Sequence, residues 1–240
     1  MDISNLTRQG RKLLKLKCCG AVIVAAGTAS RMGGIDKIME PLEGEPMVMR
    51  SIRTFQNCDA IQEIVVVTRQ DLIVPIMSLC AGIDKVKAVV AGGSSRPESV
   101  SAGLNALSAK VKLAAIHDGA RPLITWQVID RVVRAANSYG AAAPGIPVKD
   151  TIKIVNGGVV KQTPDRKNLY AIQTPQVFDI ALLRGALQKA KTDGAEITDD
   201  CSAVERMGMS VKIVEGDERN LKVTTPMDLA VAKLLLEEQA

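Results

Sequence analysis

Short apolar runs alternate with amphipathic stretches along most of this chain, and the two patterns predict different elements. Runs rich in Val, Ile and Ala are typical of buried strands, which we expect at residues 21–25, 64–68, 86–90, 113–117, 141–146 and 211–214. Apolar residues spaced three to four apart predict helices at residues 47–55, 72–80, 97–107, 127–137, 180–191 and 227–238. Because strands and helices alternate, we expect an α/β fold with a doubly wound, mostly parallel sheet.

One stretch departs from this alternation and predicts a β-hairpin. Residues 151–155 and 159–162 are β-type runs joined by Asn156-Gly157-Gly158, and an Asn-Gly pair is a strong turn signal. An isolated two-stranded arm is marginally stable and needs a surface to pack on. We therefore interpret residues 148–168 as a dimerisation arm covered by a partner subunit, with a surface ornament as the alternative.

Positive charge is concentrated at the N-terminus. Residues 1–17 hold five Lys or Arg residues against Asp2, and the net charge of the whole chain is +5, so the remainder is nearly neutral. We interpret residues 1–17 as a basic extension, with targeting or binding to an anionic surface as the alternative. Residues 18–240 suit one α/β domain. Its near-neutral charge and dispersed aromatic residues disfavour nucleic-acid binding.

Cysteine and histidine usage narrows the chemistry further. The five cysteines are scattered, no Cys-x-x-Cys occurs, and His117 is the sole histidine, which disfavours a zinc site. This pattern is typical of reduced thiols and predicts a cytoplasmic protein. No apolar run reaches about eighteen residues, so we expect no membrane-spanning helix.

The loop after the first predicted strand, residues 25–37, is rich in small residues. Its backbone N–H groups can approach phosphates, and Arg31 and Lys37 add two cations. The loop matches neither the Walker pattern nor the dinucleotide pattern Gly-x-Gly-x-x-Gly. A turn that serves packing alone is the alternative, and the two cations favour a site for a nucleoside triphosphate.

A second glycine-led loop, residues 92–100, also joins a predicted strand to a predicted helix. It could cradle a base or a phosphate, and Ser99 could donate to or accept from a base edge. The alternative is simple helix capping, in which Ser94 or Ser95 is the N-cap and Glu98 reaches back.

His117-Asp118-Gly119-Ala120-Arg121-Pro122 ends another predicted strand. A carboxylate at this position can orient a ribose hydroxyl or help to place a metal ion. An ion pair between Asp118 and Arg121 is the alternative. We interpret His117 as a packed, hydrogen-bonded residue rather than a general base.

Polar clusters follow in the second half of the chain, and each alone suits a solvated surface or a helix cap. Lys222 lies between apolar neighbours ahead of Thr224 and Thr225, and it could hold a substrate phosphate. The other clusters are Lys149-Asp150-Thr151, Asp165-Arg166-Lys167, Thr174-Pro175-Gln176 and Thr198-Asp199-Asp200.

The order of these motifs resembles the 2-C-methyl-D-erythritol 4-phosphate cytidylyltransferase family. The series begins with Ala-Ala-Gly-x-x-x-Arg-Met, Gly-Gly-x-x-Arg-x-x-Ser-Val and His-Asp-x-Ala-Arg-Pro. It continues with Asp-Thr, Asp-Arg, Thr-Pro-Gln, Thr-Asp-Asp and Asn-Leu-Lys-Val-Thr, and it spans residues 21 to about 235. The resemblance implies a Rossmann-like fold, a protruding β-arm and a homodimer. It also implies transfer of CMP from CTP to the polyol phosphate, with Mg²⁺ held by the CTP phosphates.

The resemblance assigns roles residue by residue. Arg31 and Lys37 would be catalytic and stabilise charge on the α-phosphate of CTP. The nucleotide would lie against Ala25, Ala26, Gly27, Gly93, Ser99, Asp118 and Gly119. The methylerythritol phosphate would be bound by Thr151, Arg166, Thr198, Lys222 and Thr224, with Thr151 and Arg166 reaching across the dimer.

The chemistry of the residues agrees with that assignment. The attacking group is already a phosphate anion, so fixed cations matter more than a general base. Ribitol 5-phosphate cytidylyltransferase is the nearest alternative, because it shares the fold and the CTP site. A non-catalytic nucleotide-sensing protein is a second alternative, and the presence of Arg31 and Lys37 argues against it.

Overall fold

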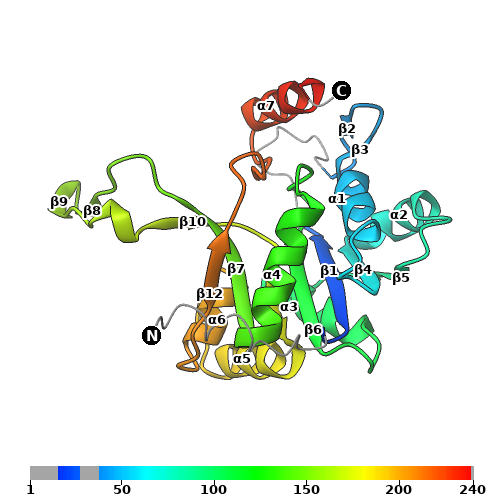
Figure 1. Cartoon of the computed structure of the whole chain (residues 1–240), viewed down its shortest axis with the longest axis horizontal. Coiled ribbons are helices and arrows are strands. Elements are labelled where there is room, and N and C mark those ends of the chain that lie inside the picture. Colours follow the sequence, from blue (N-terminus) through cyan, green and yellow to red (C-terminus); the bar gives the residue numbers. More distant parts are fainter. Residues whose placement is uncertain (1–15, 28–37, 239–240) are drawn as a thin grey trace, which may run out of the picture.

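The computed structural model describes residues 16–27 and 38–238, and these residues build an eight-stranded sheet with helices on both faces (Figure 1). The strands are β1 (Cys19–Ala25), β4 (Glu63–Thr68), β5 (Val86–Ala91), β6 (Leu113–Asp118), β7 (Ala141–Pro147), β10 (Tyr170–Ile172), β11 (Gln176–Asp179) and β12 (Lys212–Glu215). The strands β5, β4, β1 and β6 lie side by side and run parallel. All six strands that the sequence predicts are present.

The sequence did not predict β10 and β11. The strand β11 is antiparallel to both β6 and β7, and β10 is antiparallel to β7. Ala142 pairs with Val177 of β11 and with Lys212 of β12, so β11 and β12 flank β7 on opposite sides. The two added strands are only three and four residues long, which leaves too few positions for a periodic pattern.

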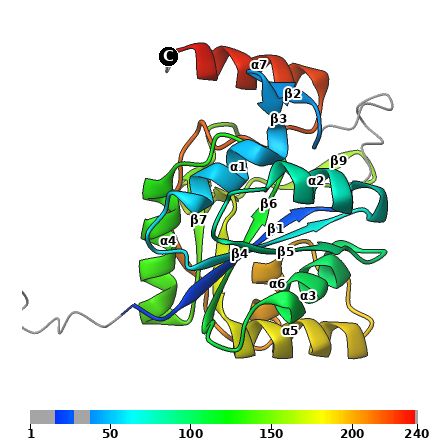
Figure 2. The ribbon, with the colours of Figure 1, turned by 90° about the vertical axis from the view of Figure 1, so that its right-hand side faces the viewer.

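The helices divide between the two faces of the sheet (Figure 2). One face packs against α1 (Met47–Gln56), α2 (Ile73–Leu79) and α4 (Trp126–Tyr139), and the other against α3 (Arg96–Ala106), α5 (Ile180–Thr192) and α6 (Asp200–Glu205). Along β1, Ala21 and Ile23 join the first core and Val22 joins the second, as the alternation of side chains in a strand requires. The fold is therefore doubly wound, as predicted.

The strand β2 (Pro41–Leu42) pairs with β3 (Glu45–Pro46) ahead of α1. The last helix, α7 (Pro226–Glu237), forms a smaller core with Leu42 of β2, Met47 of α1, Leu123 and Val223. Thr225 caps α7 by accepting a hydrogen bond from the backbone N–H of Asp228. No helix within residues 16–27 and 38–238 combines the length and the hydropathy that a membrane span requires.

The predicted arm projects from the body of the molecule (Figure 1). Its strands are β8 (Ile154–Asn156) and β9 (Val159–Gln162), and all of their residues are exposed. Asn156 pairs with Val159, so the two-residue turn is Gly157-Gly158 rather than Asn156-Gly157. Both turn glycines have positive φ, +56° and +78°, which only glycine adopts without cost. The chain returns to the sheet through a 3₁₀ turn, η4 (Arg166–Asn168).

Candidate active site

The carboxyl ends of the four parallel strands open onto one cleft of about 510 Å³. Crevices at this edge of an open α/β sheet are where such folds bind ligands. The cleft is lined by the ends of β1, β4, β5 and β6 and the loops that follow them, together with Ile38 and the segment before α7. These residues are Val24, Ala25, Ala26, Gly27, Ile38, Thr68, Arg69, Gly92, Gly93, Ser94, Ser95, Arg96, Ser99, Asp118, Ala120 and Lys222.

The loop after β5 passes so close to β1 that a side chain at residue 92 would not fit. A Cβ atom on Gly92 would lie 2.5 Å from Cβ of Ala26 and 2.7 Å from Oγ of Ser99. The backbone N–H of Gly92 donates to the carbonyl of Thr68 at 2.8 Å, which fixes the loop against β4. Glycine at this position therefore allows the two loops to form one wall of the cleft.

The same loop begins α3, and the predicted helix cap is present. Ser95 is the N-cap and accepts from the backbone N–H of Glu98 at 3.4 Å. Glu98 in turn accepts from the backbone N–H and the hydroxyl of Ser94, at 2.9 and 2.7 Å. Ser99 is buried, and its hydroxyl donates to the carbonyl of Ser95 and accepts from the N–H of Gly93. The loop after β5 therefore caps α3 and lines the cleft at the same time.

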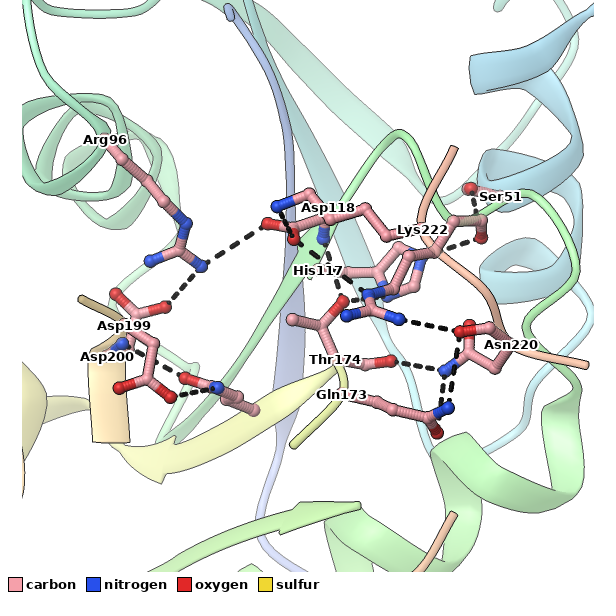
Figure 3. Close-up of polar contacts among 12 residues, drawn as sticks. Ser51, Arg96, His117, Asp118, Gln173, Thr174, Asp199, Asp200, Asn220 and Lys222 are labelled. Carbon is pink, nitrogen blue, oxygen red and sulfur yellow. Dashed lines mark hydrogen bonds and ion pairs between the residues drawn. The ribbon is translucent and has the colours of Figure 1, made fainter. Parts of the chain in front are cut away.

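Asp118 is the centre of an ion-pair cluster at the end of β6 (Figure 3). Its carboxylate lies 2.7 Å from Nζ of Lys222, 3.5 Å from Nη2 of Arg96 and 4.0 Å from Nε of Arg121. Burial alone would raise the pKa of this carboxyl, but Arg96 and Lys222 outweigh burial and lower the pKa to about 2. The predicted pair with Arg121 exists, and it is the longest of the three.

Arg96 joins this cluster to a second buried carboxylate. Its Nη2 atom lies 2.8 Å from Oδ2 of Asp200, whose side chain is completely buried (Figure 3). Burial lowers the pKa of Arg96, yet Asp200 and Asp118 together outweigh burial and raise it. Burial raises the pKa of Asp200, and Arg96 opposes that shift.

His117 is buried beneath Asp118, as the sequence predicts. Its Nδ1 atom lies 3.0 Å from the hydroxyl of Thr174, and its Nε2 atom lies 3.3 Å from the carbonyl of Arg121. Burial lowers the pKa of His117 to about 4, so the ring is neutral near neutral pH. Because a carbonyl only accepts, Nε2 carries the proton and Nδ1 accepts from the hydroxyl of Thr174. Both ring nitrogens are engaged, which is inconsistent with a general base.

The segment that carries Lys222 is held by a buried amide. The side chain of Asn220 donates from Nδ2 to the carbonyl of Thr174 at 2.9 Å, and the backbone carbonyl of Asn220 accepts from Nη1 of Arg121 at 2.7 Å (Figure 3). The backbone N–H of Val223 donates to the carbonyl of Ala120 at 2.8 Å. Lys222 lies between these anchors, so its backbone is fixed beside the end of β6.

The cleft brings together most of the residues predicted to bind the nucleotide. Ala25, Ala26, Gly27, Gly93, Ser99 and Asp118 line it, and Lys222 from the predicted polyol phosphate site joins them. Gly119 lies directly behind Ala25, since a Cβ atom on Gly119 would be 3.2 Å from Cβ of Ala25. Arg31 and Lys37 lie outside the described residues.

Four predicted substrate residues are not part of this cleft. Thr151 and Arg166 are exposed on the arm segment, where Arg166 donates to the carbonyl of Lys149 at 2.9 Å. Thr198 is exposed just ahead of Asp199, the N-cap of α6. The hydroxyl of Thr224 donates to the Asp228 carboxylate at 2.8 Å, so Thr224 belongs to the cap of α7.

Sequence reasoning missed several residues of the cluster, above all Arg96, Asp200 and Asn220. Each lies within a motif that the sequence analysis quoted, yet their mutual contacts depend on the tertiary fold. Thr68 and Arg69 also line the cleft. Their only sequence signal was their place at the end of the strand β4.

Comparison with known proteins agrees with the geometry. The family model for 2-C-methyl-D-erythritol 4-phosphate cytidylyltransferase matches residues 19–238. A relative of that name from Symbiobacterium thermophilum is 44% identical over 221 residues, covering 91% of this chain and 93% of the relative. Another from Caldanaerobacter subterraneus subsp. tengcongensis is 43% identical over 227 residues, covering 91% and 98%.

Solved structures give the same result. The 4-diphosphocytidyl-2C-methyl-D-erythritol synthase from Anaerococcus prevotii superposes with a TM-score of 0.85 at 30% identity, covering 93% of this chain and 98% of that structure. The 2-C-methyl-D-erythritol 4-phosphate cytidylyltransferase from Thermus thermophilus has a TM-score of 0.75 at 30% identity, covering 90% and 98%.

Fold, cleft and comparisons together define a nucleotidyltransferase with a mostly parallel α/β sheet. Among these enzymes, the chain belongs to the 2-C-methyl-D-erythritol 4-phosphate cytidylyltransferase family.

Proposed function

We propose that this protein transfers CMP from CTP to 2-C-methyl-D-erythritol 4-phosphate. The products are 4-diphosphocytidyl-2-C-methyl-D-erythritol and pyrophosphate, in the non-mevalonate route to isoprenoid precursors. Family membership over nearly the whole chain is the observation that carries this proposal. The described charges in and beside the cleft support it, because Arg96, Arg121 and Lys222 outnumber Asp118 and Asp200, while Arg69 is paired with Asp71. An excess of fixed cations suits an anionic ligand.

The reaction replaces one bond at the α-phosphorus of CTP. A phosphate oxygen of the polyol phosphate forms the new P–O bond, and the bond to the bridging oxygen of the β-phosphate breaks. Pyrophosphate leaves with that electron pair. Since the nucleophile is already ionised, the barrier comes mainly from repulsion between anions and from charge that develops on the α-phosphate. In this proposal Arg31 and Lys37 stabilise that charge.

The nucleotide would lie against the loops after β1 and β5. Ala25, Ala26, Gly27 and Gly93 offer backbone groups at the carboxyl end of the sheet. The hydroxyl of Ser99 already donates to Ser95 and accepts from Gly93, so one lone pair remains for a donor. A cytosine amino group would supply that donor, whereas uracil presents a carbonyl there. Ser99 would thus favour CTP over UTP.

The polyol phosphate would lie between Asp118 and the arm of a partner subunit. Lys222 would pair with its phosphate, while Asp118 and Gly119 would lie beside the ribose and the polyol. Residues of β8 and β9 expose apolar side chains, with Ile154, Val155, Val159 and Val160 each 49–61% exposed. A homodimer would cover these side chains and bring Thr151 and Arg166 to the partner's cleft. Thr198 and Thr224 would complete the pocket, and Thr224 would do so with a hydroxyl that already donates to Asp228.

Mg²⁺ would enter with the triphosphate and neutralise part of its charge, which favours departure of pyrophosphate. The donor set fits this arrangement. No group of three or more His, Cys, Asp or Glu side chains suited to a metal ion occurs among the described residues, and Asp118 already pairs with Lys222 at 2.7 Å. The phosphate oxygens of CTP would therefore supply the ligands, as is common for Mg²⁺.

Release of pyrophosphate tests the proposal. Incubation with CTP, Mg²⁺ and methylerythritol phosphate should release pyrophosphate, whereas omission of the polyol phosphate should abolish the signal. Absence of release with both methylerythritol phosphate and ribitol 5-phosphate would refute the proposed activity and favour a nucleotide-sensing protein.

We also propose a cytoplasmic location, because all five cysteines are unpaired thiols.

A further inference from the structure

We infer that Asp200 is a positioning residue for the proposed transfer, and that it acts through Arg96 on the Asp118–Lys222 pair. The inference rests on the proposed function, because its effect is on binding of the polyol phosphate. Asp200 itself does not line the cleft among the described residues, whereas Arg96, Asp118 and Lys222 do.

The Asp200 carboxylate is buried, and Arg96 is the one cation that pairs with it among residues 16–27 and 38–238. Its side chain is 0% exposed, and Oδ2 lies 2.8 Å from Nη2 of Arg96. Within the described part of the chain, neither carboxylate oxygen has a hydrogen bond of good geometry besides this ion pair. Burial of this carboxylate is costly, and its ion pair with Arg96 is the contact that offsets the cost and holds the guanidinium in place.

The backbone around Asp200 is fixed. The side-chain carbonyl of Gln176 accepts from the N–H groups of Asp200 and Cys201, both at 3.1 Å. The side-chain amide of Gln176 donates to Asp199 at 2.7 Å, and Asp199 caps α6 by accepting from the backbone N–H of Ser202. The strand β11 therefore holds the first turn of α6, and the Asp200 carboxylate has little freedom to move away from Arg96.

Arg96 is shared between two carboxylates at unequal distances. It lies closer to Asp200, at 2.8 Å, than to Asp118, at 3.5 Å. Asp118 therefore keeps its closest contact, 2.7 Å, with Lys222. If Asp200 lost its charge, Arg96 would lose the anchor that holds it near Asp118, and the Asp118–Lys222 pair would lose this neighbouring cation, as it does when Arg96 itself is removed. Asp200 thus sets the position of Lys222, which is the proposed ligand of the substrate phosphate.

The test is a double-mutant cycle on the full-length protein. Asp200→Asn should raise the KM for methylerythritol phosphate about tenfold, with a smaller change in the KM for CTP. Arg96→Gln should raise the same KM to a similar degree. In the Arg96→Gln background, Asp200→Asn should cause little further change, because the residue through which Asp200 acts is already gone. Glu205→Gln is the matched control, since it removes an exposed carboxylate at the other end of α6.

Several outcomes would overturn the inference. An unchanged KM for methylerythritol phosphate in folded Asp200→Asn would do so. An equal rise in this KM on Asp200→Asn in the wild type and in the Arg96→Gln background would also do so, because it would indicate a purely structural role for Asp200. If Asp200→Asn does not fold, the Arg96→Gln variant decides. An unchanged KM in Arg96→Gln would show that Arg96, the residue through which Asp200 must act, has no effect on substrate binding. The wild type separates the two claims. An inactive wild type refutes the proposed function and the inference with it, whereas an active wild type with unaffected variants refutes the inference alone.

Discussion

Nζ of Lys222 lies 2.7 Å from Oδ2 of Asp118, although the two residues come from distant parts of the chain. Lys222 precedes α7 and is 43% exposed, whereas Asp118 ends β6 and is nearly buried. The ammonium group of Lys222 is therefore open to the cleft, and the Asp118 carboxylate in the cleft wall orients it. An incoming phosphate can share this cation without displacing the pair.

Replacement of Lys222 tests that relationship. Lys222→Met should raise the KM for methylerythritol phosphate at least about tenfold, because the substrate phosphate loses a charge-assisted contact. The KM for CTP should change less. Lys233→Met removes an exposed lysine from α7 and should leave both constants unchanged. Steady-state kinetics would contradict the assignment if Lys222→Met altered the KM for CTP alone.

Lys37 should act on the chemical step. Lys37→Ala should lower kcat by about two orders of magnitude or more, because in the proposed function Lys37 stabilises the charge that develops on the α-phosphate. Single-turnover measurements with saturating CTP and polyol phosphate would separate this effect from substrate binding. Near-normal turnover in the variant would show that Lys37 has another role.

Two helical glycines should respond to alanine in opposite ways. A Cβ atom on Gly103 of α3 would overlap Val22 and lie 2.8 Å from Cγ2 of Val67. Gly103→Ala should therefore destabilise the protein by about 1–3 kcal/mol. Gly185 of α5 has its nearest neighbour, Cε of Met207, at 4.0 Å. Gly185→Ala should stabilise the protein by about 0.5–1 kcal/mol through higher helix propensity. Urea denaturation measures both, and destabilisation of similar size in the two variants would contradict the packing described for α3.

His117 should make stability depend on pH. Its folded pKa of about 4 is depressed below the unfolded value of about 6.5. The stability that it contributes is complete above the unfolded pKa and is lost as the pH falls toward the folded pKa. Between about pH 7 and about pH 5, the free energy of unfolding should fall by about 2 kcal/mol more in the wild type than in His117→Gln.

The comparison with His117→Gln isolates this residue from other titrating groups. Asp200 has a raised pKa, so its protonation acts in the opposite direction, and it is present in both proteins. His117 is the sole histidine of the chain. Parallel stability curves for the two proteins would show that His117 is not buried in a neutral form.

The sequence predicted the parallel half of the sheet because β1, β4 and β6 are dense runs of mostly buried apolar residues and β5 is an apolar run of intermediate burial. It missed β10 and β11, which are short and depend on pairing with β7 for their existence. The arm was predicted with a connection at Asn156-Gly157-Gly158, and the two-residue turn Gly157-Gly158 lies within it. Both turn positions have positive φ, which a Gly-Gly pair adopts readily.

The sequence predicted several residues that line the cleft, but it did not predict the contacts between their side chains. The order of the motifs indicated Gly93, Ser99 and Asp118 for the nucleotide and Lys222 for the polyol phosphate, and one cleft is lined by all four residues. The ion pair between Arg96 and Asp200 joins α3 to α6, and its formation depends on how two helices pack on one face of the sheet. A local pattern carries no information on such an approach.

Substrate preference tests the central claim most directly. The specificity constant kcat/KM should be measured with CTP and Mg²⁺ for methylerythritol phosphate and for ribitol 5-phosphate, with the cytidine product identified by mass spectrometry. We expect methylerythritol phosphate to be favoured by about a hundredfold or more, because a site built to pair polar substrate groups discriminates strongly between polyols. Equal or higher specificity for ribitol 5-phosphate would contradict the proposed function.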